Sequence, residues 1–354
     1  MAFAASPADL AAALMHLRTA TRVLVRIVQF RATSFAQLER AAAKIAWGAW
    51  VHPGARVRFR VTCKKSRLYH SDAVAERLAT AIRGAVRDVA IVARASDDDD
   101  AGDQQTQLFI VRMADDECTI SADAAGEALH RRGYRQATAK APLRETLAAA
   151  MLLAAGYDGS LAMYDPFCGS GTIVVEAALI ARRIAPGLHR SFAAEAWPGA
   201  DARAWRAARA DANARVLAQA AAPIAGSDRD VGAIAAAQSN AERAGVAADV
   251  AFTVAPVSVA VAPAPAGLLV TNPPYGVRTG DRATLRNLYA RFGAVARSAF
   301  AGWTCALLSA DRTPGHDLEL QLGLALTPRW RSTNGGIPVR LLAGEISAQR
   351  RRTR

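Results

Sequence analysis

The second half of the chain alternates short apolar runs with amphipathic stretches, and this alternation limits the possible folds more than any other feature. Runs typical of strands span 161–165, 224–228, 249–254, 267–271 and 303–309, with a later pair at 323–330 and 337–346. Stretches typical of helices lie between them, near 143–154, 172–184, 231–244 and 283–300. Strands that alternate with helices in this way predict a parallel sheet covered by helices, in an α/β fold.

The first 125 residues show a different pattern, in which strands are less regularly interleaved with helices. Residues 55–63 alternate strictly, so that Val57, Phe59 and Val61 share one face and three arginines share the other. This pattern is typical of a half-buried strand with a basic outer face. The remaining predicted strands are 21–30, 88–94, 107–113 and 118–122, and the predicted helices are 35–47 and 72–86. We therefore expect a smaller α+β domain before the α/β domain.

The boundary between these patterns is a basic segment, GEALHRRGYRQATAK, at residues 126–140. We interpret it as a connecting arm. The expected organisation is a first domain over 1–125, the arm over 126–140, a second domain over 141–346 and a basic tail over 347–354. The stretch 186–222 is expected to be an insertion between the first two strand–helix units of the second domain.

The charge of the chain points to an anionic partner. There are 44 Lys and Arg residues against 31 Asp and Glu residues, which gives a net charge of +13. An excess of this size favours nucleic acid as a partner. The first 96 residues hold 16 basic and only 5 acidic residues, so the excess is strongest in the first domain.

Composition excludes several other classes of protein. A hydrophobic content of 52% with 21% charged residues excludes a largely disordered chain. The four cysteines lie far apart and form no C-x-x-C, so we expect neither a disulfide framework nor a metal site. We also expect no membrane segment and no signal peptide, because apolar runs are interrupted by charge and the first 16 residues lack a basic start. The default expectation is a cytoplasmic protein.

The segment Asp165–Thr172, DPFCGSGT, connects a predicted strand to a predicted helix. Ligands of α/β folds bind outside the carboxyl ends of the strands. Gly169 and Gly171 would let the backbone approach such a ligand, and the helix N-terminus offers free N–H groups. The third glycine of a dinucleotide fingerprint is missing, so NAD is a poor fit. The carboxylate of Asp165 at the strand tip would suit a cationic or amine-bearing ligand.

A second acid follows the next predicted strand. Asp228 ends the run 224–228, where a carboxylate can accept both hydroxyls of a ribose. It lies 63 residues after Asp165, well beyond the usual spacing of about twenty, and the insertion at 186–222 accounts for the difference. We expect Asp230 to cap the following helix.

The most specific motif is Asn272-Pro273-Pro274-Tyr275-Gly276, which follows the strand 267–271. An exocyclic amine of a base is a poor nucleophile because its lone pair is delocalised into the ring. The Asn272 side-chain oxygen and the Pro273 carbonyl could accept its two N–H groups and favour the attacking geometry. The prolines fix that backbone and remove competing donors. Tyr275 would stack on the base.

With both motifs in order, the chain resembles the S-adenosylmethionine-dependent amino-methyltransferases. Three further segments, LHRRGYRQATAKAPLRETLAAAML, RSFAAEAWPGAD and VTCKKSRLYHSDAVAERL, narrow the resemblance. Together they are similar to the bacterial THUMP-domain large-subunit (23S) ribosomal RNA guanine-N2 methyltransferases, over residues 17–344. The resemblance implies a Rossmann-like class I methyltransferase domain, with a mostly parallel seven-stranded sheet and an antiparallel last strand, preceded by a THUMP-like, ferredoxin-like RNA-binding domain.

The resemblance also implies site residues. The pocket of the methyl donor, S-adenosylmethionine, would be lined by Asp165, Pro166, Phe167, Gly169, Gly171, Thr172 and Asp228. The target amine would be held by Asn272, Pro273, Pro274 and Tyr275. RNA contacts are expected from Lys64, Lys65, Arg67, Arg131, Arg132 and Arg135. Two departures stand out: no acid follows the third strand, in 252–257, and a short N-terminal segment predicts a truncated RNA module.

Other functions stay open at this point. NPPY also occurs in enzymes that methylate adenine N6 or a protein amide, so tRNA, DNA or protein are alternative substrates. A non-catalytic RNA-binding ribosome-assembly factor is the third interpretation. Protein partners cannot be inferred from these motifs.

Overall fold

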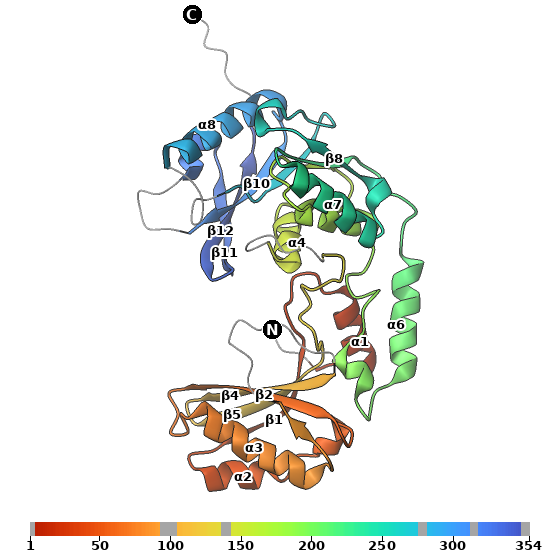
Figure 1. The fold of residues 1–354 in the computed structure, drawn as a ribbon, viewed down its shortest axis with the longest axis vertical. Coiled ribbons are helices and arrows are strands. Elements are labelled where there is room, and N and C mark those ends of the chain that lie inside the picture. Colours follow the sequence, from red (N-terminus) through yellow and green to blue (C-terminus); the bar gives the residue numbers. More distant parts are fainter. Residues whose placement is uncertain (1–3, 93–104, 136–142, 275–281, 312–317, 348–354) are drawn as a thin grey trace, which may run out of the picture. The chain divides into compact units, whose positions relative to one another are not determined.

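The structure, a computed structural model, describes residues 4–92, 105–135, 143–274, 282–311 and 318–347 (Figure 1). The chain divides into two compact units. Unit 1 comprises Met1–Leu129 with Gly187–Ala212, and unit 2 comprises His130–Pro186 with Asn213–Arg354. Most of the segment expected to be an insertion in the second domain therefore belongs to unit 1, as do the first four residues of the expected arm.

Unit 2 contains a seven-stranded sheet in the order β11-β12-β10-β9-β6-β7-β8. The strands are β6 (Ala162–Asp165), β7 (Ile224–Asp228), β8 (Val250–Val254), β9 (Gly267–Thr271), β10 (Thr304–Ala310), β11 (Thr327–Asn334) and β12 (Ile337–Glu345). The pairs β6–β7, β6–β9, β7–β8 and β9–β10 are parallel, whereas β12 is antiparallel to both of its neighbours. The predicted Rossmann-like sheet with an antiparallel last strand is confirmed.

The helices of unit 2 follow the predicted intervals. They are α4 (Glu145–Ala154), α5 (Thr172–Ala181), α7 (Val231–Arg243) and α8 (Arg282–Ala299), with short 3₁₀ helices at Ala247–Asp249, Val257–Val259 and Leu318–Leu322. All ten residues of α5 are buried. Behind β9 and β10, the aromatic side chains of Tyr289, Phe292, Phe300 and Trp303 fill a core cluster. This packing fixes the strands whose carboxyl ends carry the two motifs.

Unit 1 contains a five-stranded sheet in the order β1-β5-β4-β2-β3. Its strands are β1 (Leu24–Arg31), β2 (Arg56–Lys64), β3 (Ala90–Ile91), β4 (Thr106–Ala114) and β5 (Glu117–Asp123). The helices α2 (Phe35–Ala42) and α3 (Ser71–Ala85) cover one face of this sheet (Figure 1). The alternation in β2 is confirmed, because Val57, Phe59 and Val61 are all buried. Trp47, in the 3₁₀ helix Trp47–Ala49, packs edge-on against Phe59.

Two helices of unit 1 have no counterpart among the sequence predictions. The first, α1 (Pro7–His16), begins with a capping box in which Ser6 and Asp9 each accept the other's backbone N–H. The second, α6 (Ala202–Ala214), follows the short 3₁₀ helix Ala193–Ala196. Both are rich in alanine, which forms helices well but carries little hydrophobic periodicity. These two helices therefore leave no apolar–polar periodicity in the sequence from which they could be predicted.

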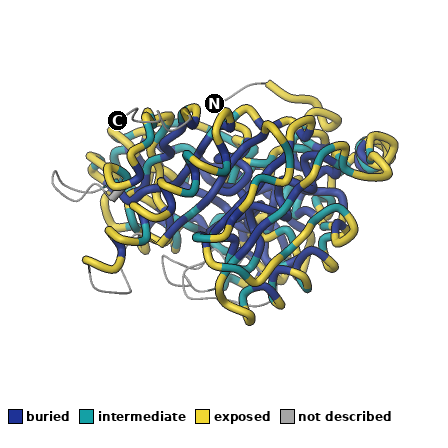
Figure 2. The backbone as a smooth tube through the Cα atoms, turned by 90° about the horizontal axis from the view of Figure 1, so that it is seen from above, coloured by how far each residue is buried: buried dark blue, intermediate teal, exposed yellow. Residues whose placement is uncertain are grey.

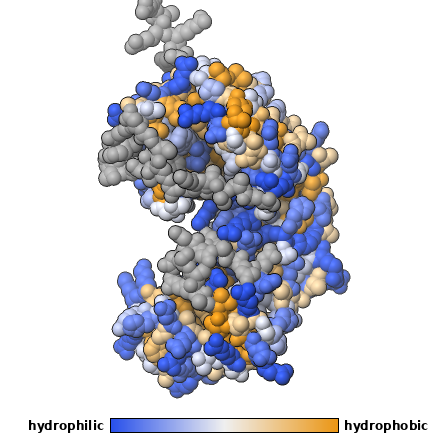
Figure 3. Space-filling model, viewed as in Figure 1, coloured by the Kyte–Doolittle hydropathy of each residue, from blue (hydrophilic) through white to orange (hydrophobic). Residues whose placement is uncertain are grey.

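Burial separates the interior from the surface as expected for globular units. In Figure 2 buried segments run through the interior, and exposed segments lie along the outside. The face shown in Figure 3 is mainly hydrophilic, with smaller hydrophobic patches. Within the part of the chain that the structure describes, no helix combines the length and the apolar character needed to cross a membrane.

Candidate active site

The glycine loop, residues 166–171, leads from the end of β6 into α5, and its two glycines have different roles. Gly169 and Gly171 both have positive φ angles, +50° and +80°. A Cβ atom on Gly171 would lie 2.9 Å from Ala237 Cβ and 3.0 Å from Phe252 Cζ, whereas a Cβ on Gly169 would meet nothing within 4 Å. Gly171 is therefore required by packing as well as by its conformation, while Gly169 borders open space that can receive a ligand.

Asp228 ties the end of β7 to this loop. Its Oδ2 accepts a hydrogen bond from Gly169 N at 3.0 Å, and its Oδ1 accepts one from Asp230 N at 3.0 Å. Each carboxylate oxygen has a second lone pair for a further donor. Asp230 caps α7 as predicted, because its Oδ1 accepts from Gly232 N and Ala233 N. Asp228 is half-buried at the predicted strand tip and can still receive the hydroxyls of a ribose.

Asp165 joins the glycine loop to the strand that carries the second motif. Its Oδ1 accepts hydrogen bonds from Thr271 Oγ1 at 2.6 Å and from Phe167 N at 3.0 Å. The carboxyl is 1% exposed. Burial raises the pKa of Asp165 to about 7; the charge of Asp228 adds to the rise, and the hydrogen bonds from Thr271 and Phe167 oppose it. Asp165 therefore organises the loop through one oxygen, a role that the sequence did not indicate.

The Thr271–Asp165 hydrogen bond places the glycine loop and the Asn-Pro-Pro motif at neighbouring strand ends. Asn272 follows Thr271 directly, and its Oδ1 is buried with no hydrogen-bond partner among the residues that the structure describes. Pro273 is buried and Pro274 is exposed. Tyr275 lies outside the described residues. A buried amide oxygen normally has a donor. The oxygen of Asn272 can therefore accept an N–H group from a bound substrate.

A hydrogen-bond chain from α7 supports the glycine loop from behind. Asn240 Nδ2 donates to Ser170 O at 2.9 Å, and Arg243 Nη2 donates to Asn240 Oδ1 at 2.5 Å. Arg243 Nε donates to Tyr134 O at 2.6 Å, so the chain ends on the segment before α4. Sequence analysis missed these residues. The available signal was a polar Asn240 in helical register with the buried Ile234 and Ala237.

Two arginines of the expected connecting arm form ion pairs within unit 2. Arg132 Nε pairs with Glu176 Oε1 at 2.8 Å, and the side chain of Arg132 is only 3% exposed. Arg135 Nη2 pairs with Glu145 Oε2 at 3.2 Å, with 12% of its side chain exposed. Both arginines were expected to contact RNA, but in this structure they neutralise buried carboxylates on α5 and α4. Arg131 is exposed, and RNA contact by these three arginines remains a prediction.

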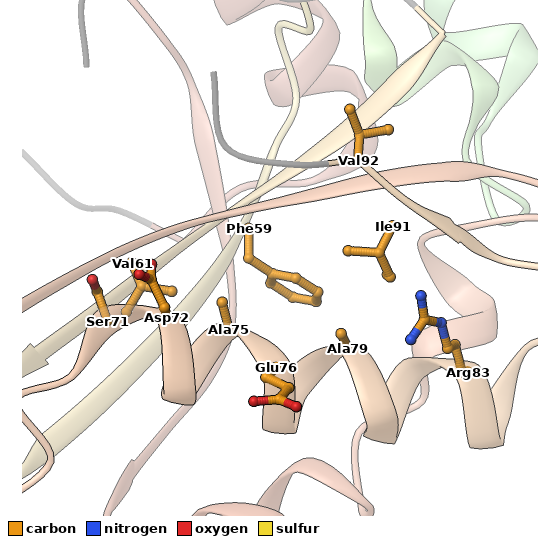
Figure 4. A pocket seen from close by; sticks show the side chains of 10 residues that line it. All are labelled: Phe59, Val61, Ser71, Asp72, Ala75, Glu76, Ala79, Arg83, Ile91 and Val92. Atoms are coloured by element: carbon orange, nitrogen blue, oxygen red, sulfur yellow. The ribbon is translucent and has the colours of Figure 1, made fainter. Parts of the chain in front are cut away.

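The other expected RNA contacts lie in unit 1. Lys64, Lys65 and Arg67 are exposed in the connection from β2 to α3. Near that connection, a cavity of about 260 Å³ opens between α3 and the strands (Figure 4). Phe59 and Ile91 line it from the sheet, and Asp72 and Glu76 line it from α3. Arg83 also lines it from α3, so the wall carries two carboxylates against one cation and suits a phosphate poorly. It shares no residue with the glycine loop.

No three His, Cys, Asp or Glu side chains come together in the described part of the chain in a way that could hold a metal ion. The cysteines are free thiols, and burial raises the pKa of the Cys168 thiol in the glycine loop far above its usual value. Cys168 is therefore a packed neutral side chain, and the polar atoms of the site belong to Asp165, Asp228 and Asn272.

Comparisons with known proteins agree with this geometry. The family model described as UPF0020, RMKL-like, methyltransferase domain, matches residues 132–328. A Synechocystis sp. protein, slr0064, named provisionally as an RNA methyltransferase, is 35% identical over 326 residues, which cover 92% of this chain and 83% of the relative. The matched region of the family model contains the glycine loop, Asp228 and Asn272.

A longer relative and a solved structure extend the comparison. The ribosomal RNA large subunit methyltransferase K/L of Syntrophotalea carbinolica is 37% identical over 344 residues, 94% of this chain and 47% of that protein. This chain thus spans about half the length of that relative. The crystal structure of SMU.472, named provisionally as a methyltransferase and solved with S-adenosylhomocysteine (SAH), matches with a TM-score of 0.81 at 26% identity. The match covers 97% of this chain and 88% of that one.

Proposed function

This chain belongs to the UPF0020 family of RMKL-like methyltransferases, and on that premise we propose that it methylates the exocyclic N2 amine of a guanosine in RNA. The proposed RNA is 23S ribosomal RNA, and the methyl donor is S-adenosylmethionine. The names of the relatives support RNA as the substrate class. The choice of guanine N2 rests on the motif resemblance.

The strand tips of unit 2 suit this donor. When bound, S-adenosylmethionine supplies an electrophilic methyl group carried on a positively charged sulfur. Asp228 would accept the ribose hydroxyls through its remaining lone pairs, and the open side of Gly169 would let the donor lie against the backbone. The carboxylate of Asp228, at the open side of the glycine loop, favours a cationic ligand over an anionic one.

The observation that carries the proposal is the buried, unpartnered Oδ1 of Asn272. Together with the Pro273 carbonyl, it would accept both N–H groups of the target amine. This would draw the nitrogen towards tetrahedral geometry and free its lone pair to bond the methyl carbon, while the carbon–sulfur bond breaks and S-adenosylhomocysteine leaves. The methylated nitrogen is acidic and releases its extra proton to water. No general base with a shifted pKa is then required, and the protein acts by orienting the amine.

The test uses the full chain with 23S ribosomal RNA from a strain that lacks the gene, together with radiolabelled donor. We expect N2-methylguanosine after digestion and mass mapping. N6-methyladenosine or a methylated protein amide as the product would replace the proposed acceptor with one of the alternatives. An absence of methyl transfer, with no heat of donor binding in calorimetry, would favour a non-catalytic assembly factor.

A variant then tests the assigned site. Asn272→Ala should lower the rate of methyl transfer about 100-fold, the usual cost of removing one preorganised polar contact at a reacting group. RNA and donor affinities should stay close to those of the parent protein. Asn213→Ala, at an exposed position of α6, is the matched control and should keep full activity. Full activity in Asn272→Ala would show that the acceptor site has been wrongly assigned.

A further inference from the structure

We call the last residue of β2 together with the connection to α3 the 64–70 loop, and this connection presents alternate side chains to solvent. Lys65, Arg67 and Tyr69 are exposed, whereas Ser66 is half-buried and Leu68 is 5% exposed. Leu68 belongs to the hydrophobic core of unit 1. The loop is therefore anchored by one face, and the other face carries two cations followed by an aromatic ring.

Hydrogen bonds hold this loop against the turn between β4 and β5. Ser66 Oγ donates to Lys64 O at 3.0 Å and accepts from Asp116 N at 3.0 Å. Arg67 N donates to Asp116 Oδ1 at 2.8 Å, and Asp115 N donates to Lys64 O at 3.2 Å. A loop that is already ordered loses little conformational entropy when it binds a partner. The loop is therefore preorganised for binding through its exposed side chains.

Tyr69 is the feature that hydrogen bonding and packing do not explain. Its side chain is 67% exposed, and it is the one aromatic residue among the exposed large hydrophobic side chains of the described chain. Its ring lies beside the His70 ring, with centroids 4.0 Å apart and an interplanar angle of 41°. An aromatic ring held in water next to cations is typical of surfaces that stack nucleobases.

Local charge shows which part of a nucleic acid this loop can bind best. Three acids lie near the cations of this loop: Asp72 is five residues after Arg67, Asp116 is hydrogen-bonded to Arg67 N and Ser66 Oγ, and Asp115 N donates to Lys64 O. These acids offset the three cations, so phosphate attraction alone would be modest at this loop. Stacking does not depend on net charge, and every base offers a ring face. The ring of Tyr69 should therefore contribute more to affinity than any single cation.

We propose that Tyr69 is a stacking platform for an unpaired base of the RNA substrate, with Lys65 and Arg67 on the neighbouring phosphates. This inference rests on the proposed function, in which the chain acts on RNA. Bases in duplex RNA are already stacked and their faces are covered, so the platform selects single-stranded or looped RNA. It adds a base contact to a loop for which the sequence indicated phosphate contacts only.

The experiment measures binding of the full chain to a short fluorescent single-stranded RNA and to its duplex. Tyr69→Ala should weaken single-strand binding about 10-fold, the lower part of the range for one stacked base. Tyr69→Phe should bind like the parent because it keeps the ring, and Tyr69→Leu should bind like Tyr69→Ala. Leu161→Ala, which truncates an exposed side chain of unit 2, is the control and should leave binding unchanged.

Salt dependence separates stacking from phosphate contacts. Tyr69→Ala should leave the slope of log affinity against log salt unchanged. Lys65→Ala and Arg67→Ala should each make this negative slope shallower by about 0.7. Methyl transfer by Tyr69→Ala should show a raised KM for RNA with an unchanged kcat. The melting temperature of every variant should match that of the parent protein, since each replaced side chain is exposed to solvent.

The outcomes distinguish this inference from the proposed function. If the parent protein binds RNA and Tyr69→Ala binds equally well, the platform is refuted while RNA methylation stands. Parent-like binding by Tyr69→Leu, or an equal loss on duplex RNA, would also overturn stacking. If the parent protein neither binds nor methylates RNA, the proposed function itself fails, and with it the platform.

Discussion

The glycine loop of unit 2 and the 64–70 loop of unit 1 both lead from a strand into a helix, yet they offer different surfaces. In the glycine loop, the backbone N–H groups of Phe167 and Gly169 donate hydrogen bonds to the carboxyls of Asp165 and Asp228. The space beside Gly169 is open. In the 64–70 loop, Asp116 holds the backbone at Arg67 and the side chain of Ser66, and the side chains of Lys65, Arg67 and Tyr69 are exposed to solvent. The first arrangement suits a small ligand held by backbone, and the second suits a large partner held by side chains.

Left-handed backbone residues show the same difference. Gly171 has a φ of +80° where α7 and β8 leave no room for a Cβ, and Lys65 has a φ of +49° where its side chain is exposed. A non-glycine residue can adopt this conformation at a modest cost when nothing crowds it. The difference between the two loops can thus be tested by replacing Gly171 with alanine and Lys65 with glycine and comparing the changes in stability.

The largest effect is expected for Gly171→Ala. The added Cβ would overlap Ala237 and Phe252 in a conformation that alanine rarely adopts. We expect a loss of about 3 kcal/mol in the free energy of unfolding and a fall of at least about 100-fold in donor affinity. Thermal unfolding and calorimetry measure the two. Gly169→Ala is the comparison, because its Cβ meets open space, and it should cost about 1 kcal/mol. Equal losses in the two variants would contradict the packing role given to Gly171.

The second prediction concerns pH. The pKa of Asp165 is raised to about 7 in the folded protein, so the folded state binds a proton more tightly than the unfolded chain between about pH 4 and pH 7. The stabilising contribution is present below this window and is lost as the pH rises through it. In Asp165→Asn the unfolding free energy should decline less steeply across this window, because the titrating carboxyl is removed. Chemical denaturation at several pH values measures it.

A second buried carboxyl, that of Glu145, contributes to the same decline of stability with pH. Burial raises its pKa to about 7 as well, against the charge of Arg135, so part of the decline should persist in Asp165→Asn. The control is Ser66→Ala in the 64–70 loop, which should leave the decline of the unfolding free energy with pH unchanged. A decline that is identical in the parent and in Asp165→Asn would show that the carboxyl titrates normally.

The sequence predicted the strands of unit 2 well, because buried parallel strands and their helices have strong local patterns. Asp165, Asp228 and Asn272 were found for a related reason: strand tips are visible as the ends of apolar runs. The pairing of Arg132 with Glu176 was not foreseen, because the two residues lie 44 positions apart and a basic segment looks the same whether it meets RNA or a buried acid. The Thr271–Asp165 bond depends on strand order, which local patterns do not contain.

The third prediction tests the hydrogen-bond chain behind the glycine loop. Asn240→Ala removes the donor to Ser170 O and leaves Arg243 without its acceptor. Because the loop itself keeps its contacts with Asp228, we expect a moderate loss of about 10-fold in donor affinity. Calorimetry with the donor measures this. Asn240→Asp keeps the acceptor but not the donor, so it should restore the bond to Arg243 without restoring the loop. Restored affinity in Asn240→Asp would point to Arg243 as the important partner.

The smallest effect is expected for Lys65→Gly. Glycine relieves the left-handed strain at this position but makes the unfolded chain more flexible, so the two effects nearly cancel, within about 0.5 kcal/mol. Chemical denaturation of the full chain, beside Gly171→Ala, measures the contrast between the loops. The loop should keep its shape, because Ser66, Asp116 and the buried Leu68 hold it independently of the lysine side chain. A large loss of stability would instead mean that the Lys65 side chain takes part in fixing the loop, and the proposed separation between a rigid backbone and freely presented side chains would no longer hold.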